Sequence, residues 1–146
     1  MPTCGKGQGL ARLKIETEFY SLTTEPSLGR MRMRLSGFWS DRIAADFAEH
    51  FTLASSETRS RLPPDRELLI LADLREHAIF SRDALGEIEK LASGVAKRPV
   101  RISIIASSTL QRMQLRRLML ARQADIFLDE REAMDWLFGD GVERPK

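Results

Sequence analysis

The fold of this chain is decided by the stretch Glu67-Leu68-Leu69-Ile70-Leu71-Ala72-Asp73-Leu74. The five residues from Leu68 to Ala72 are all apolar, with Pro63-Pro64 before them and charged residues on both sides. A short, continuously apolar run predicts a strand that is buried on both faces, as in the middle of a parallel sheet. Asp73 follows this run at the strand's carboxyl end, where α/β proteins usually place functional groups.

Strands and helices alternate on both sides of the central strand. Apolar residues with a period of two predict further strands at 13–19, 30–35, 100–104 and 124–128. Four stretches of helical apolar spacing are preceded by residues that can cap a helix: Ser40 or Asp41, Ser81, one of Ser107, Ser108 and Thr109, and Asp129. The first two strands are expected to form an antiparallel hairpin. The order β-β-α-β-α-β-α-β-α predicts an α/β fold with a five-stranded, mixed, mostly parallel sheet.

The two faces of this sheet differ in polarity. Arg30, Arg32 and Arg34 alternate with apolar residues in the second strand, and the last two strands also carry one polar face. A sheet covered by helices on both faces would need most strands to be apolar on both sides. We therefore expect the helices to lie mainly on one face, with the other partly open to water or to a partner.

Length and composition indicate one ordinary soluble domain. The chain has 146 residues, which we divide into a Gly-rich flexible tail at 1–10 and a single domain at 11–146. A net charge of +2 is too small to indicate nucleic-acid binding. Cys4 is the only cysteine, so no internal disulfide can form. Since no leader-like segment and no run of about 18 apolar residues occurs, we expect a cytoplasmic protein without a membrane span.

The order of elements resembles the STAS family, which includes the SpoIIAA-like anti-sigma-factor antagonists and the cytosolic domains of sulfate transporters. The resemblance runs from about Tyr20 to Gly139 and looks closest to a divergent, uncharacterised bacterial branch. It is carried by Gly37 after the second strand, the central strand, Ser81 at the next helix, and the ending Ile126-Phe127-Leu128-Asp129 with Glu132 to Leu137. The resemblance implies helices along one side of a mixed sheet.

The same resemblance implies a switch site after the central strand. In phosphorylated family members, the helix that follows this strand opens with an Asp-Ser pair and soon a Gly, and the serine is the kinase target. Here the matching residues are Phe80-Ser81-Arg82-Asp83, which keep the serine but lack that Asp and Gly. Ser81, with Asp73, is therefore a possible phosphorylation or switch site. The alternative is that Ser81 is only a helix cap.

The residues do not indicate catalysis or a metal site. Asp73, His77 and Ser81 are the residue types of a hydrolase triad, but residues four apart face each other only on a helix, and 74–80 is expected to be a loop. The only other histidine, His50, lies on the first helix and is expected to be half-buried. We therefore expect no enzyme activity, no catalytic residues, no metal and no cofactor.

A cluster of arginines lies on the third expected helix. Residues 91–124 contain no acid, and Arg112, Arg116 and Arg117 share one side of the helix. One interpretation is a solvated face that pairs with the acidic C-terminal helix. The other is a docking surface for an anionic partner, such as an acidic protein, nucleotide phosphate or membrane headgroups. The absence of interleaved aromatic residues argues against nucleic acid.

The function predicted from these features is a regulatory protein-interaction module. Phe38 and Trp39, just after the hairpin, are a possible interface of a homodimer; the alternative is that Trp39 covers the end of its own core. The alternative function is a binding domain for a small apolar or lipid-like ligand, with a pocket lined by Met31, Met33, Met113 and Met119. The other interpretation of these methionines is that they belong to the ordinary core. A closed apolar pocket larger than ~300 Å³ would favour this alternative.

Overall fold

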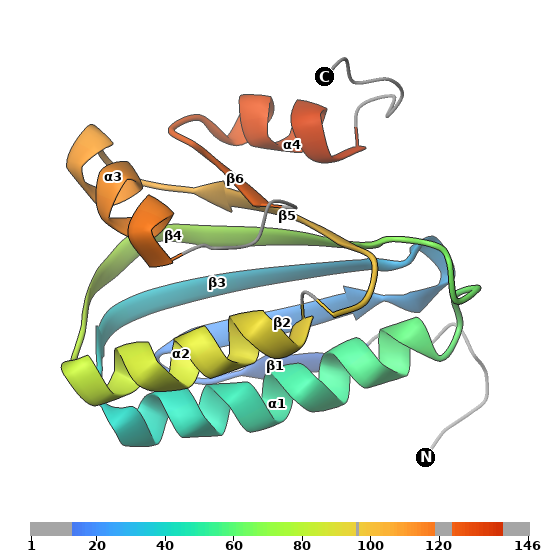
Figure 1. The fold of residues 1–146 in the computed structure, drawn as a ribbon, viewed down its shortest axis with the longest axis horizontal. Coiled ribbons are helices and arrows are strands. Elements are labelled where there is room, and N and C mark those ends of the chain that lie inside the picture. The colour runs from blue at the N-terminus through green and yellow to red at the C-terminus, as the bar shows by residue number, and fades with distance from the viewer. Residues whose placement is uncertain (1–12, 96, 119–123, 139–146) are drawn as a thin grey trace.

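The computed structural model describes residues 13–95, 97–118 and 124–138, and within these ranges strands and helices alternate as expected (Figure 1). The elements are β1 (Lys14–Glu16), β2 (Tyr20–Glu25), the 3-10 turn η2 (Pro26–Leu28), β3 (Arg30–Trp39), α1 (Asp41–Arg59), β4 (Leu68–Phe80), α2 (Arg82–Val95), β5 (Val100–Ile105), α3 (Thr109–Leu118), β6 (Ala124–Phe127) and α4 (Glu130–Phe138). The tail expected at 1–10 lies outside the described residues.

All the described strands form one sheet whose spatial order equals their order in the chain, β1-β2-β3-β4-β5-β6. The pairs β1–β2 and β2–β3 are antiparallel, and the pairs from β3 to β6 are parallel. The predicted α/β fold, the mixed sheet and the interior position of the central strand are confirmed. The sheet has six strands rather than five. The strand expected at 13–19 is shorter, β1, and β2 is a further strand that was not expected. The chain breaks between them at Thr17, whose hydroxyl accepts the amides of Phe19 and Tyr20.

The central strand β4 is longer than its apolar run. It has 13 residues, and the expected loop at 74–80 is wrong because this segment is strand. Its partner β3 also continues, through Gly37 to Trp39, and pairs with it through two register shifts. Gly37 has a φ of +80° beside the second shift, a conformation that glycine adopts readily. Pairing with β3 therefore extends β4 through a charged segment that has no apolar run.

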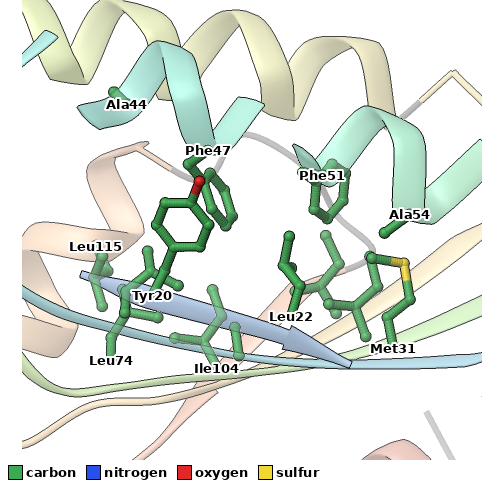
Figure 2. Close-up of a cluster of buried hydrophobic side chains, with 14 of the residues drawn as sticks. Tyr20, Leu22, Met31, Ala44, Phe47, Phe51, Ala54, Leu74, Ile104 and Leu115 are labelled. Carbon is green, nitrogen blue, oxygen red and sulfur yellow. The ribbon is translucent and has the colours of Figure 1, made fainter. Parts of the chain in front are cut away.

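Helices cover the two faces of the sheet unequally. α1 and α2 lie along one face (Figure 1), where Phe47 and Phe51 of α1 pack on side chains such as Leu22 of β2 (Figure 2). Leu115 of α3 joins this core. α4 packs on the opposite face, with Ala133 and Leu137 among the members of a second, smaller cluster. The expectation that helices lie mainly on one face is confirmed, and α4 is the exception.

Helix starts are fixed by side-chain caps at all four expected places, and the cap of α2 by Ser81 is described with the candidate site. The amide of Ile43 donates to Ser40 Oγ at the start of α1, at 3.4 Å. The amide of Gln111 donates to Ser108 Oγ at 3.1 Å, which selects Ser108 among the three candidates for α3. For α4, the amide of Glu132 donates to Asp129 Oδ2, also at 3.1 Å. Each contact satisfies an amide that has no partner within its helix.

An aromatic cluster closes the end of the main core. The Trp39 ring lies 5.1 Å from that of Phe47 and 5.8 Å from those of Tyr20 and Phe80, between ring centres. Trp39 Nε1 donates to the carbonyl of Ser36 at 3.0 Å, so its polar atom is satisfied inside the fold. These contacts join β2, β3, β4 and α1 at one place.

The polar tip of Tyr20 reaches the surface of α1. Its Oη lies 2.6 Å from His50 Nδ1 and 3.4 Å from Asp46 Oδ2. Burial raises the pKa of the Tyr20 phenol to about 12, and the negative charge of Asp46 adds to the effect. His50 is half-buried, as expected.

Candidate functional site

Asp73 lies inside β4 beside the first register shift, and Arg75 holds its carboxylate. The amide and Nε of Arg75 both donate to Asp73 Oδ1 at 3.0 Å, and Nη2 donates to Oδ2 at 2.8 Å. The same Nη2 lies 3.1 Å from Glu130 Oε1 of α4, and Arg32 of β3 binds Glu130 Oε2 at 3.1 Å. The four side chains thus form one ion network that joins β3, β4 and α4 on the second face of the sheet.

The charges of this network keep Asp73 ionised. Partial burial acts to raise the pKa of Asp73, but the hydrogen bonds from Arg75 and the charges of Arg75 and Arg32 outweigh it, and the net pKa is lowered. A general base would need a pKa near the working pH. The Asp73 carboxylate instead orients Arg75, and Arg75 and Arg32 together bind Glu130 at the start of α4.

Ser81 caps α2, at a distance from Asp73. The amide of Ala84 donates to Ser81 Oγ at 3.1 Å, and the amide of Ser81 donates to the carbonyl of Trp39 at 2.9 Å. Asp73 lies seven positions before Phe80, the last residue of the extended strand β4, which is about 23 Å at ~3.3 Å per residue, and Ser81 follows Phe80. The structure therefore does not bring the two into one site, and the backbone of His77 lies between them on the same strand. This spacing excludes the triad geometry.

Phe38 and Trp39 point to opposite faces of β3 and have opposite exposure. Trp39 is 0% exposed, whereas Phe38 is 53% exposed. The interpretation of Trp39 as an interface anchor is corrected, because its ring and its Nε1 are both occupied by its own chain. Phe38 alone is left of the pair as a residue that a second subunit can contact.

One face of α3 is exposed and both apolar and basic. Leu115 is buried and Gln111 donates to the Leu74 carbonyl at 3.1 Å, so these two residues mark the side of α3 that faces the sheet. Met113 lies two positions from each, about 160° around the helix from both. Leu110 is 65% exposed and Met113 55%. We call Leu110, Arg112, Met113 and Arg116 the α3 surface.

The arginines of the α3 surface have no acidic partner in the part of the chain that the structure describes. Arg112 is half-buried and Arg116 exposed, while the side chain of Arg117 lies outside the described residues. The expected pairing with the C-terminal helix does not occur within the described ranges, because Glu130 of α4 binds Arg32 and Arg75 of the sheet instead. The α3 surface thus combines two exposed apolar side chains with uncompensated positive charge.

Comparison with models of protein families gives no match, and comparison with curated proteins gives none either. Among solved structures, the chain is similar to an uncharacterized protein of the DUF3478 family with a SpoIIAA-like fold from Shewanella loihica PV-4. The likeness has a TM-score of 0.56 and covers 93% of this chain and 99% of that chain, at 18% sequence identity. The fold is SpoIIAA-like. This confirms the STAS-like architecture that was expected from the order of the elements.

The cavity inside the SpoIIAA-like fold is small. Met33, Ile70 and Ile102 are among the apolar residues that line a space of about 90 Å³ between the sheet and α1 and α2. Of the methionines expected to line a ligand pocket, Met31 is buried in the core, Met113 is exposed and Met119 lies outside the described residues. Drug-sized ligands occupy pockets of ~300–1,000 Å³, well above this volume.

Sequence reasoning missed the ion network of the SpoIIAA-like fold. Arg75 was placed in a loop, and Glu130 lies 55 positions from Arg75 and 98 from Arg32. The charge alternation of β3 predicts a polar face, but no local pattern indicates which acidic residue binds its arginines.

Within the described ranges, no three His, Cys, Asp or Glu side chains gather as metal ligands do, and no helix there has the length and apolar character to cross a membrane.

Proposed function

We propose that this protein is a regulatory module that acts by binding another protein through the α3 surface. The observation that carries the proposal is the combination of Met113 and Leu110, both exposed, with Arg112 and Arg116, which have no acidic partner among the described residues. Apolar anchors beside arginines are typical of interface centres. The positive charge selects a partner with an acidic segment, because complementary potentials favour the encounter.

The size of the apolar cavity supports this function over the carriage of a small apolar ligand. A carrier needs ~300 Å³ or more, and the cavity between α2 and the sheet has about 90 Å³. A well-filled core with apolar groups at the surface suits a module that works by contact. Among the described residues, Asp73 is bound by Arg75 and Ser81 caps α2, so neither of them lends support to an enzyme.

The test uses a photo-crosslinking amino acid at Met113, in cells of the protein's own host. The matched control carries the same amino acid at Leu53, which is 57% exposed on α1. We expect a defined adduct from position 113 that is absent from position 53, and the adduct identifies the partner for purification. Equal adducts from both positions would show non-specific contact and contradict the proposal.

Binding of the purified partner then tests the charges. Reversal of Arg112 and Arg116 to Glu should weaken binding at least ~30-fold, because the loss of two charged contacts costs about 2 kcal/mol or more. The free energy of unfolding should change by only about 0.5–1 kcal/mol, as for exposed charges. Lysine substitutions in the partner's acidic segment should restore binding. A large loss of stability instead would show that these arginines are structural.

The possible homodimer and the Ser81 switch stay predictions of this proposal. Sedimentation at ~10 and ~100 µM, with Phe38→Ala beside the wild type, tests the dimer. Phosphate on Ser81 would replace the hydroxyl that now accepts the Ala84 amide, at a helix start that favours negative charge. Phosphoamino-acid mapping of the protein from its host tests that modification.

A further inference from the structure

A groove of about 410 Å³ lies between the C-terminal halves of α1 and α2. Figure 1 places this end of the two helices away from α3, so the groove is separate from the α3 surface. Apolar residues from both helices and the hydroxyl of Ser56 line it, together with the cations Arg59, Lys90 and Arg98. A volume of this size is in the range of small-molecule sites.

The charge in the groove is one-sided. No acidic residue is among those that line it. Lys90 has a weak ion pair at 3.7 Å with Glu87, one turn away on α2, and Arg59 Nη1 donates to the carbonyl of Pro99 at 3.1 Å. Arg98 has no ion pair within the described ranges. The groove therefore holds three positive charges, of which only Lys90 has an acidic partner, and that partner does not line the groove.

Two further observations bear on this potential. Partial burial lowers the pKa of Arg59, and the positive charge of Arg98, which lines the same groove, lowers it further. α1 and α2 both end near the groove, and each helix end contributes about half a negative charge. Three full positive charges exceed these two halves together with the one charge of Glu87, so the groove stays positive and an anion would relieve the repulsion.

We propose that the groove between α1 and α2 binds a free small molecule that carries a phosphate group. Arg59 and Arg98 supply planar donors that match phosphate oxygens in pairs, and Lys90 supplies a mobile third charge. The Ser56 hydroxyl, which makes no hydrogen bond within the described residues, is a neutral donor. The apolar lining holds the remainder of the molecule.

Gly94 provides the means to close the groove without damage to the fold. It lines the groove from α2, and a Cβ atom added there meets no atom within 4 Å. A leucine side chain at this position would extend into the open space and occupy it. Gly86 is the matched control, because it lies on the same helix, also has nothing within 4 Å of an added Cβ, and does not line the groove. Both replacements favour a helix over glycine, so neither should lower the melting temperature.

The experiment is isothermal titration calorimetry of the whole chain at low salt. The probes are inorganic phosphate, pyrophosphate and adenosine monophosphate, with adenosine as the control without phosphate. We expect at least one phosphate probe to bind and adenosine to give no binding. Arg98→Ala and Gly94→Leu should each weaken that binding at least tenfold, while Gly86→Leu should leave it unchanged.

Three outcomes would overturn the proposal. The first is that no phosphate probe binds at 10 mM, a concentration that would detect about the weakest affinity such a site could use. Unchanged binding in Gly94→Leu is the second, because it places the probe elsewhere. Sedimentation with phosphatidic-acid vesicles, without binding of the soluble probes, is the third, because the phosphate would then belong to a lipid surface. These variants do not change the α3 surface, so the test of the groove is independent of the test of protein binding by the α3 surface.

Discussion

Replacement of Trp39 by alanine tests the structure at the place where the main core closes. Trp39 is completely buried and packs on the rings of Tyr20, Phe47 and Phe80. A buried tryptophan removes ~150–250 Å² from water, which at ~25 cal/mol/Å² is about 4–6 kcal/mol as an upper bound. Measured truncations of this kind cost about 3–5 kcal/mol. We therefore expect Trp39→Ala to lose that amount, a large part of the total stability of a domain.

The assay is urea unfolding followed by circular dichroism, with thermal melting beside it. For a chain of 146 residues the entropy of unfolding is about 0.3 kcal/mol/K, so the loss corresponds to about 10–16 °C in melting temperature. Phe38→Ala is the control, because the neighbouring ring is half exposed and should cost less than about 1 kcal/mol. Trp39→Phe keeps a ring but loses the hydrogen bond to the Ser36 carbonyl, and should fall between the two.

A Trp39→Ala protein within about 1 kcal/mol of the wild type would refute the reasoning. It would mean that the ring does not fill the core, and that the strands β3 and β4 do not close over α1 as described. If Trp39→Ala keeps the stability of the wild type but no longer forms a dimer, Trp39 is an interface residue and its assignment to the core is wrong.

Two further changes test the central strand and the tip of Tyr20. Ile70→Asp should abolish cooperative folding, because it buries an unpaired charge, whereas Leu53→Asp on the exposed side of α1 should be tolerated; a soluble Ile70→Asp protein with a sharp melt would contradict this. The Tyr20 pKa is raised to about 12 from 10.0, so the folded state holds the phenol proton more tightly than the unfolded state and stability falls as pH rises through that window. The urea midpoint should therefore drop more between pH 9 and pH 12 in the wild type than in Tyr20→Phe, and equal drops would show that the phenol is not coupled to folding.

The central strand shows how far local pattern predicts this fold. The run from Leu68 to Ala72 is apolar because its residues face helices on one side of the sheet and, at Leu71, the core under α4 on the other. That burial is visible in the sequence. The continuation of β4 through Arg75 and Glu76 is not visible, because it depends on pairing with β3 and these two side chains are exposed. A strand that is held by its partner rather than by burial carries no apolar signal.

The candidate sites divide in the same way. Ser81 as a cap follows from its place before a helical pattern, and the arginines of α3 follow from helical spacing. The separation of Asp73 from Ser81 depends on whether 74–80 is a loop or a strand. The local pattern predicted a loop, and this segment is strand. The groove between α1 and α2 brings Arg59 together with Lys90 and Arg98, which lie more than 30 positions further along the chain. Contacts between residues so far apart in the chain depend on how the two helices are aligned on the sheet, and no local pattern encodes that alignment.

The order of the strands has a consequence for synthesis on the ribosome. Because each strand pairs with the one before it in the chain, the sheet can grow at a single edge as the chain emerges. Once β4 has emerged, it is the edge strand, unpaired on one side, until β5 is complete at Ile105, 25 residues after Phe80. At ~5–20 residues per second this interval is about 1–5 s, during which the most apolar strand of the protein is an open edge. The interval is the time when a nascent chain of this protein most needs a chaperone, and slow codons between Phe80 and Val100 would lengthen it.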